Sequence, residues 1–149
     1  MPRQLRPVPV TAVEIAKYAY TVGADDPVHF DREAARERGH ADVVAALGFH
    51  MVLRHACPNL TPLSQFEEDG GRDDLTPPNT ARRRMAGESR ARFHAPIVAG
   101  DSMTLTKRIT DLAEKQGRSG PLATVTYTLE FRARSGIPLV TEEYVRILR

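Results

Sequence analysis

The chain has 149 residues, of which 41% are hydrophobic and 27% charged, and its net charge is +2. This length suits one domain with one buried core, and the composition excludes a disordered or fibrous protein. Acidic and basic residues are interleaved, so the charge does not indicate a nucleic-acid-binding surface. No apolar run approaches the roughly 20 residues that cross a bilayer, and no secretory leader is recognisable, so we expect a cytoplasmic protein that binds no membrane.

The first predicted elements are an extended segment and a helix. Residues 3–10 alternate polar and apolar side chains and include prolines, a pattern typical of an edge strand or an extended lead-in. Thr11 and Glu14 have the spacing of a capping box, in which each side chain bonds the other residue's backbone N–H. We therefore predict a helix over residues 12–22, ending at Gly23.

A loop and two further helices are predicted next. Residues 23–31 are rich in turn formers and should form a loop. Asp31 should cap a short helix that ends at Gly39. The longest apolar stretch follows, and within it we predict a central buried helix over residues 46–56.

The second half of the chain predicts a sheet. The polar, proline-rich segment beginning at Pro58 is a loop insertion, 58–80, too long for an ordinary connection. After it the hydrophobic period changes to two, and four strands are predicted at 89–93, 102–112, 123–134 and 139–148. Early helices and a late antiparallel sheet predict an α+β fold, with residues 1–149 forming one domain.

Three motifs resemble those of MaoC-like dehydratases and R-specific enoyl-thioester hydratases. GADDPVHFDREAA, at 23–35, resembles the signature G-D-x-N-P-aliphatic-H. DVVAALGF, at 42–49, is similar to the family's entry to its central helix. The stretch 82–122, which includes ARFHAPIVAGDSMTLT, resembles N-terminal-type MaoC dehydratase domains, above all the mesaconyl-C4-CoA hydratases. The resemblance implies a hotdog fold, an antiparallel β-sheet wrapped around a central α-helix.

The resemblance also implies a site for adding water to a 2-enoyl thioester, or for the reverse dehydration. In that family an aspartate and a histidine five positions later activate the water, because hydroxide is otherwise a poor leaving group. His29 matches the histidine, but the aspartate position is occupied by Ala24. Asp25, displaced by one residue, or Asp26, in place of the family asparagine, are the candidates to work with His29.

Candidate substrate contacts complete the predicted site. The backbone N–H of Gly48 is expected to stabilise the charge that develops on the thioester carbonyl. His94 matches a family position, although a packing role is the alternative. Arg83 and Arg84 would suit the phosphates of coenzyme A, although a solvated strand edge explains them equally well. No metal and no cofactor are expected, beyond the coenzyme A or phosphopantetheine that belongs to the substrate.

The sequence is compatible with three functions. The first is a hydro-lyase (hydratase or dehydratase) acting on an acyl-CoA or acyl-carrier-protein thioester, as a homodimer or heterodimer with a second hotdog chain. The second is a non-catalytic acyl-binding subunit whose partner supplies the intact aspartate and histidine, which Ala24 favours. The third is a hotdog thioesterase or a natural-product tailoring enzyme, although residues 46–56 contain no aspartate or glutamate.

Overall fold

The computed structural model describes residues 3–4, 7–55, 64, 75, 77, 83–118 and 120–149. The predicted loop insertion at 58–80 therefore lies outside the described residues except at three positions. The helical elements come first in the chain: α1 (Ala12–Val22), the short 3-10 helix η1 (Pro27–His29), α2 (Arg32–Glu37) and α3 (His50–His55). No helix in this part of the chain is long and apolar enough to cross a membrane.

The capping predictions are confirmed. Thr11 and Glu14 form the capping box at the start of α1, and Gly23 ends the helix with a left-handed φ of 72°. Asp31 caps α2 by accepting a hydrogen bond from the Glu33 backbone N–H. The predicted helix over 46–56 is wrong at its start, because Gly48 has a φ of 94°, which no α-helix accommodates. The chain makes a turn there, and α3 begins only at His50.

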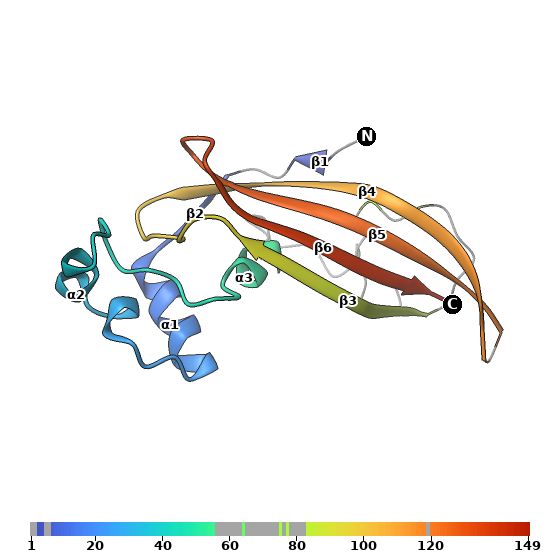
Figure 1. Ribbon diagram of the computed structural model, residues 1–149, viewed down its shortest axis with the longest axis horizontal. Coiled ribbons are helices and arrows are strands. Elements are labelled where there is room, and N and C mark those ends of the chain that lie inside the picture. The colour runs from blue at the N-terminus through green and yellow to red at the C-terminus, as the bar shows by residue number, and fades with distance from the viewer. Residues whose placement is uncertain are drawn as a thin grey trace.

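An antiparallel sheet forms the other layer, as the α+β prediction requires. Its strands are β1 (Arg3–Gln4), β2 (Val8–Pro9), β3 (Arg84–Phe93), β4 (Ser102–Gly117), β5 (Gly120–Ala133) and β6 (Pro138–Leu148). The order is β1-β4-β5-β6-β3, with β2 also paired to β4. Among the described strands β3 therefore pairs only with β6 and forms one edge of the sheet. The sheet curls, with α1 and α2 near one end and α3 against its inner face (Figure 1).

The four strands predicted in the second half of the chain are present as β3 to β6, and the lead-in predicted at 3–10 contains the short strands β1 and β2; β3, β4 and β5 extend several residues further than predicted. β3 begins at Arg84 instead of Ser89, because its first residues pair with the end of β6 although nearly all of its side chains are exposed. β4 and β5 continue as a hairpin to the Gly117–Gly120 pair, where most side chains of β4 face solvent. Hydrophobic alternation cannot mark a strand that buries neither face.

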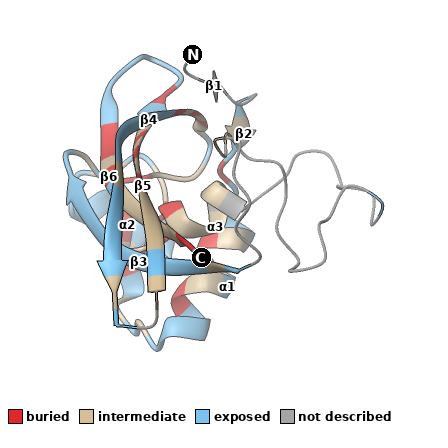
Figure 2. Cartoon of the chain, turned by 90° about the vertical axis from the view of Figure 1, so that its right-hand side faces the viewer, coloured by how far each residue is buried: buried red, intermediate tan, exposed pale blue. Residues whose placement is uncertain are grey.

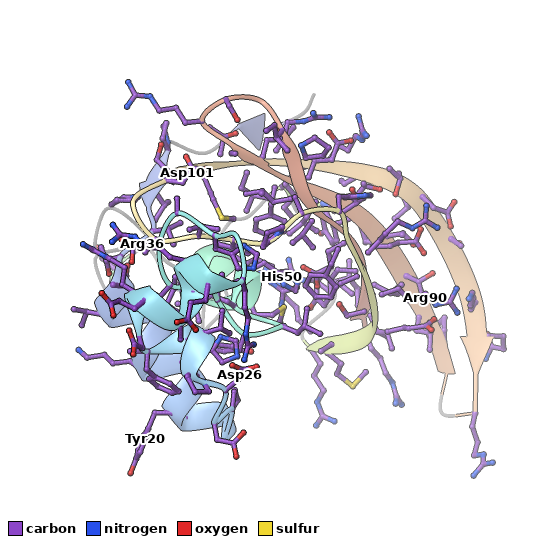
Figure 3. The ribbon with its side chains drawn as sticks, turned by 60° about the vertical axis from the view of Figure 1, so that its left-hand side comes forward. Tyr20, Asp26, Arg36, His50, Arg90 and Asp101 are labelled. Atoms are coloured by element: carbon purple, nitrogen blue, oxygen red, sulfur yellow. The ribbon has the colours of Figure 1, made fainter. Side chains whose placement is uncertain are left out.

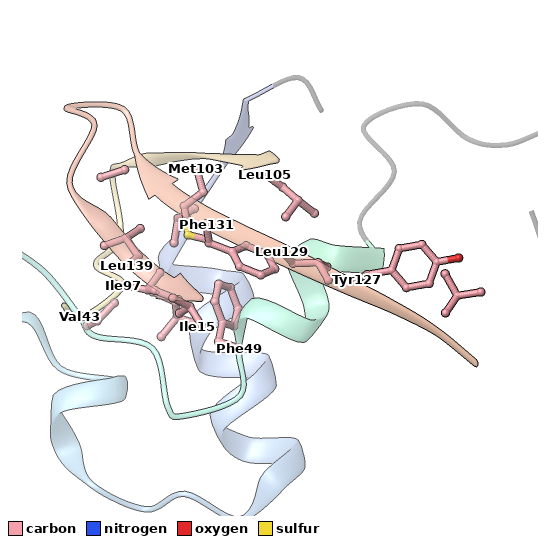
Figure 4. Packing of buried hydrophobic residues seen from close by; sticks show 14 of the residues in the cluster. Ile15, Val43, Phe49, Ile97, Met103, Leu105, Tyr127, Leu129, Phe131 and Leu139 are labelled. Carbon is pink, nitrogen blue, oxygen red and sulfur yellow. The ribbon is translucent and has the colours of Figure 1, made fainter. Parts of the chain in front are cut away.

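The core lies between the inner face of the sheet and the helices. Figure 2 shows buried positions on the central strands and on α1. Phe49, fully buried just before α3, lies close to Ile15 of α1 and to side chains of β5, among them Leu129 (Figure 4). The ring of Tyr18 packs edge-on against Phe49, with centroids 5.6 Å apart. Phe49 thus joins the first helix, the central helix and the sheet.

Replacing Phe49 by alanine should therefore lower the free energy of unfolding by about 3–5 kcal/mol, the usual cost of truncating a fully buried aromatic ring. Urea denaturation followed by circular dichroism measures this change. The partly exposed Phe30, which belongs to no core cluster, is the control, and Phe30→Ala should cost less than about 1 kcal/mol. Equal losses for the two variants would contradict the packing described for Phe49.

Candidate functional site

The loop between α1 and α2 is fixed to the segment that leads into α3. The Val44 backbone N–H donates a hydrogen bond to the Val28 carbonyl, at 3.0 Å. Val44 also forms an isolated β-bridge with Val98, which ties the same segment to the chain just before β4. The loop that carries the family signature therefore has a defined position relative to α3.

His29 is oriented by a second contact of the same segment. Its Nδ1 lies 2.6 Å from the Val44 carbonyl oxygen. Because a carbonyl oxygen can only accept, Nδ1 carries the hydrogen and donates it. In the neutral ring the other nitrogen, Nε2, then has an unshared electron pair and can accept a proton. The half-buried His29 thus has the tautomer and orientation of a candidate general base.

The two candidate carboxylates do not complete a pair with His29. Both oxygens of Asp26 are engaged: Oδ1 accepts from the Val28 N–H at 3.0 Å, and Oδ2 lies 2.6 Å from Arg38. These contacts, above all the one with Arg38, hold the pKa of Asp26 below its usual value. Asp25 is exposed, and among the described residues no hydrogen bond or ion pair joins it to His29. Asp26 therefore acts in this structure as the cap of η1.

The turn before α3 leaves backbone donors available, among them the N–H groups of Leu47 and Gly48. Among the described groups, the Gly48 N–H has no acceptor. The Tyr18 hydroxyl donates to the Leu47 carbonyl, at 3.2 Å. In a trans peptide the carbonyl and the next N–H point in opposite directions, so the Gly48 N–H points away from Tyr18. Tyr18 thereby fixes the direction of the candidate carbonyl-binding donor.

Four polar side chains form a polar cluster between α3 and the sheet: His50 and Glu142 are buried, Arg54 is partly buried, and Ser89 belongs to the exposed strand β3. The Glu142 side chain is 0% exposed, and its Oε1 accepts from Arg54 at 2.7 Å and from Ser89 at 2.5 Å. His50 Nε2 lies 3.7 Å from Glu142 Oε2, too far for a hydrogen bond. The ring of His50 packs edge-on against Phe93 and Phe131. Burial lowers the pKa of His50, so its ring is neutral near pH 7.

The other predicted substrate residues lie elsewhere. Arg83 and Arg84 are at the start of β3, roughly 30 Å along the strand from its end near α3. His94 follows β3, and its Nε2 lies 2.9 Å from the Thr141 hydroxyl. It lines a shallow groove of about 340 Å³ with Arg90, Ala91, Arg92, Thr141 and Glu143. Because side chains alternate along a strand, this groove is on the face opposite Phe93, away from α3.

The structure thus brings only part of the predicted site together within one chain. His29 is fixed to the segment that leads to Gly48, whereas the arginines lie at the far end of β3 and His94 lies on the opposite face of the sheet. In Figure 3, Asp26 of the signature loop lies in the helical part of the molecule, and Arg90 of β3 lies beyond His50 on the sheet. Sequence reasoning missed Tyr18 and Glu142. The sequence signal for Glu142 was its position two residues after the buried Val140, since side chains two residues apart in a strand point to the same face of the sheet.

The comparisons with known proteins agree with this architecture. The family model described as the FAS1-like, dehydratase domain region matches residues 4–142. The UPF0336 protein of Clavibacter michiganensis subsp. michiganensis is 36% identical over 136 residues, covering 91% of this chain and 82% of the relative. The mesaconyl-C(4)-CoA hydratase of Chloroflexus aurantiacus is 42% identical over 67 residues, which are 44% of this chain and 24% of that enzyme.

Solved structures confirm the predicted hotdog fold. A chain of the HadBC (3R-hydroxyacyl-ACP dehydratase) complex from Mycobacterium tuberculosis aligns with a TM-score of 0.72 at 19% identity, covering 99% of this chain and 94% of that chain. A MaoC-like dehydratase aligns with a TM-score of 0.74 at 24% identity, covering 99% of this chain and 41% of that chain. At these identities the similarity establishes the fold alone.

Gly48→Ala should destabilise the protein, because an added Cβ would overlap the Tyr18 hydroxyl oxygen and because the backbone φ is positive. In a Tyr18→Phe background the overlap disappears, so the same substitution should cost less, with a coupling of about 1 kcal/mol or more. Tyr20→Phe, on the same helix but 84% exposed, is the matched control and should show no coupling. Equal costs in all three backgrounds, measured by urea denaturation, would exclude the Tyr18–Gly48 contact.

Burial of the neutral His50 ring predicts a pH dependence of stability. Because the pKa of His50 is lower in the folded than in the unfolded protein, the unfolded chain binds the extra proton first. Stability should therefore fall as the pH drops through the ordinary histidine value of 6.5, by at most about 1.4 kcal/mol per pH unit. The loss should stop once the pH is below the folded-state pKa.

The measurement is urea denaturation from about pH 7.5 to about pH 5.5, the range in which histidine titrates. His50→Leu should flatten the curve in this range, since the variant lacks the linked proton. Asp26 and Asp42, whose pKa values are also lowered, contribute only as the pH falls below about 4. An unchanged slope in His50→Leu would show that another group causes the dependence.

Proposed function

This chain belongs to the family of FAS1-like dehydratase regions, the MaoC-like hotdog domains, and on that premise we propose that it serves the hydration or dehydration of an acyl thioester as one chain of a two-chain enzyme. The observation that carries the proposal is the state of the signature loop. His29 is oriented as a base, but no carboxylate of the loop contacts it among the described residues. Proton transfer in this chemistry needs two groups, one to hold the water and one to move the proton.

In this proposal the partner chain contributes an intact aspartate and histidine, and the present chain contributes acyl binding. The Gly48 N–H is a group available here to bind a thioester carbonyl. Similar proteins give precedent for two chains: HadBC is a complex, and a curated relative from Thermomonospora curvata is a probable enoyl-CoA hydratase alpha subunit. That relative is 26% identical, and the aligned region covers 95% of this chain and 45% of its own length.

The exposed edge of β3 supports pairing with a second sheet. Eight of its ten residues pair with β6, and among the described residues no strand pairs with its other side, so one row of backbone groups faces outward there. If two such edges pair antiparallel, the start of β3 in one chain lies beside the end of the edge strand in the other. Arg83 and Arg84 would then approach the partner's site, where they could bind the phosphates of coenzyme A or phosphopantetheine. No other cofactor is needed, and a cytoplasmic location is part of the proposal.

A self-sufficient hydratase is the second candidate, and the tautomer of His29 favours it. Such an enzyme requires Asp25 to move to His29 when substrate binds, because in this structure the two side chains are not in contact. The two candidates differ in what His29 does. In the two-chain enzyme His29 is dispensable, whereas in the self-sufficient enzyme it is the base.

The test is hydration of a panel of 2-enoyl-CoA thioesters, followed by loss of the enoyl absorbance. We expect no turnover by the purified chain alone and turnover by a complex with a hotdog chain that carries both catalytic residues. In the complex, His29→Ala should change the rate less than about 3-fold, whereas loss of a general base costs about 10²–10⁴-fold. Turnover by the chain alone that disappears in His29→Ala would instead establish the self-sufficient enzyme.

A gain-of-function variant sharpens this test. Ala24→Asp restores the family spacing of five residues before His29 and should give the isolated chain measurable turnover. Ala24→Asn, of nearly the same shape but without a basic oxygen, is its control and should stay inactive. Activity in both variants, or in neither, would show that the missing aspartate is not what limits this chain.

A further inference from the structure

The edge strand β3 carries an excess of positive charge. Residues 83–93, which are the strand and the residue before it, contain four arginines and one glutamate: Arg83, Arg84, Arg90, Arg92 and Glu88. The whole chain is close to balanced, with 21 basic and 19 acidic residues. The excess is therefore a property of this edge of the sheet, and the composition of the chain does not explain it (Figure 1).

Neighbouring carboxylates compensate only part of this charge. Arg90 Nε lies 2.6 Å from Glu88 Oε1, and Glu143 of β6 lies opposite Arg90 in the strand ladder. Arg92 lies opposite the uncharged Thr141, and among the described residues no carboxylate forms an ion pair with it. Both acidic side chains near the end of β3 thus serve Arg90, and Arg92 keeps its full charge.

The arginines lie beside the outer row of backbone groups. Arg90 and Arg92 are exposed, and they point to the same face of the sheet because they are two residues apart. A strand that pairs with this edge places its own side chains roughly 5 Å from them. Backbone hydrogen bonds form with any sequence, so the facing side chains decide which strand binds best.

A second copy of the chain is a poor match for this edge. It brings the same excess of arginines to the seam, and its Glu88 is already bonded to its own Arg90, so it compensates the facing arginines only in part. Like charges that face each other across two strands are destabilising, whereas opposite charges are favourable. The backbone groups still permit self-pairing when no other strand is present. An edge strand with carboxylates at the facing positions binds better.

We propose that β3 docks an acidic edge strand, which places aspartate or glutamate opposite Arg90 and Arg92, and that the chain therefore forms a heterodimer in preference to a homodimer. The proposal rests on the proposed function, because the second hotdog chain is the source of that strand. It adds the chemistry by which this chain selects its partner.

A charge-inverted copy of the chain, Arg90→Glu with Arg92→Glu, is the probe, since it presents an acidic edge on the same fold. Fluorescently labelled wild-type chain is titrated with the probe and, separately, with unlabelled wild-type chain. At an ionic strength of about 0.1 M the probe should bind about 10-fold more tightly. At about 1 M the difference should become small, because salt screens the facing charges. Slower hydrogen exchange at the β3 amides locates the contact.

Two further variants control for net charge and for folding. Lys115→Glu with Arg118→Glu makes the same change in net charge at exposed positions near the tip of the β4–β5 hairpin, and it should bind no better than wild type. Arg90→Gln with Arg92→Gln should associate with itself more strongly than wild type, because it removes the repulsion. Circular dichroism shows whether each variant is folded, and the glutamine variant decides the proposal if the probe is not.

Equal affinities of probe and wild-type chain, or an equal gain in the hairpin variant, would overturn the proposal. The experiment uses no thioester, so its result is independent of the proposed function. If the probe binds as expected but no complex hydrates a thioester, the proposed function is wrong and the acidic partner strand stands. If a complex is active but the probe has no advantage, only the charge selection is wrong.

Discussion

The ion pair between Arg54 and Glu142 constrains how the helical layer meets the sheet. It joins the central helix to β6 inside the core, where a charge without its partner would cost several kcal/mol. Because α3 has only six described residues, few apolar contacts could fix its position. The pair, with Ser89 on the neighbouring strand, fixes α3 laterally, and the turn at Gly48 just before the helix is held with it. The turn whose N–H direction Tyr18 fixes is thus followed directly by a helix that a buried ion pair positions.

Much of the fold could be predicted because local signals agreed with it. The capping box at Thr11, the Asp31 cap and the alternation in β5 each reflect forces between near neighbours. The start of α3 could not be predicted, since apolar spacing does not report the positive φ of Gly48. The first half of β3 was missed for a related reason. An edge strand that is stabilised by backbone pairing and has exposed side chains, several of them arginines, shows no alternation of apolar and polar residues from which it could be predicted.

The candidate site was only partly predictable. The spacing of the signature indicated His29 and showed that Ala24 replaces the family aspartate. It could not show that Arg38 forms an ion pair with Asp26, because that contact depends on the position of the end of α2 in the fold. Nor could it show that Val44, fifteen residues later, sets the tautomer of His29. These contacts join separate elements, and sequence spacing contains no information about them.

The open edge of β3 has a consequence for how such a protein is made in a cell. A ten-residue strand whose outer row of N–H and C=O groups has no partner strand among the described residues can pair with another extended chain, including a copy of itself. In the proposed two-chain enzyme, any excess of this chain over its partner would therefore tend to self-associate or aggregate. Matched synthesis of the two chains, ideally from one transcript, would keep this edge covered from the moment the sheet forms.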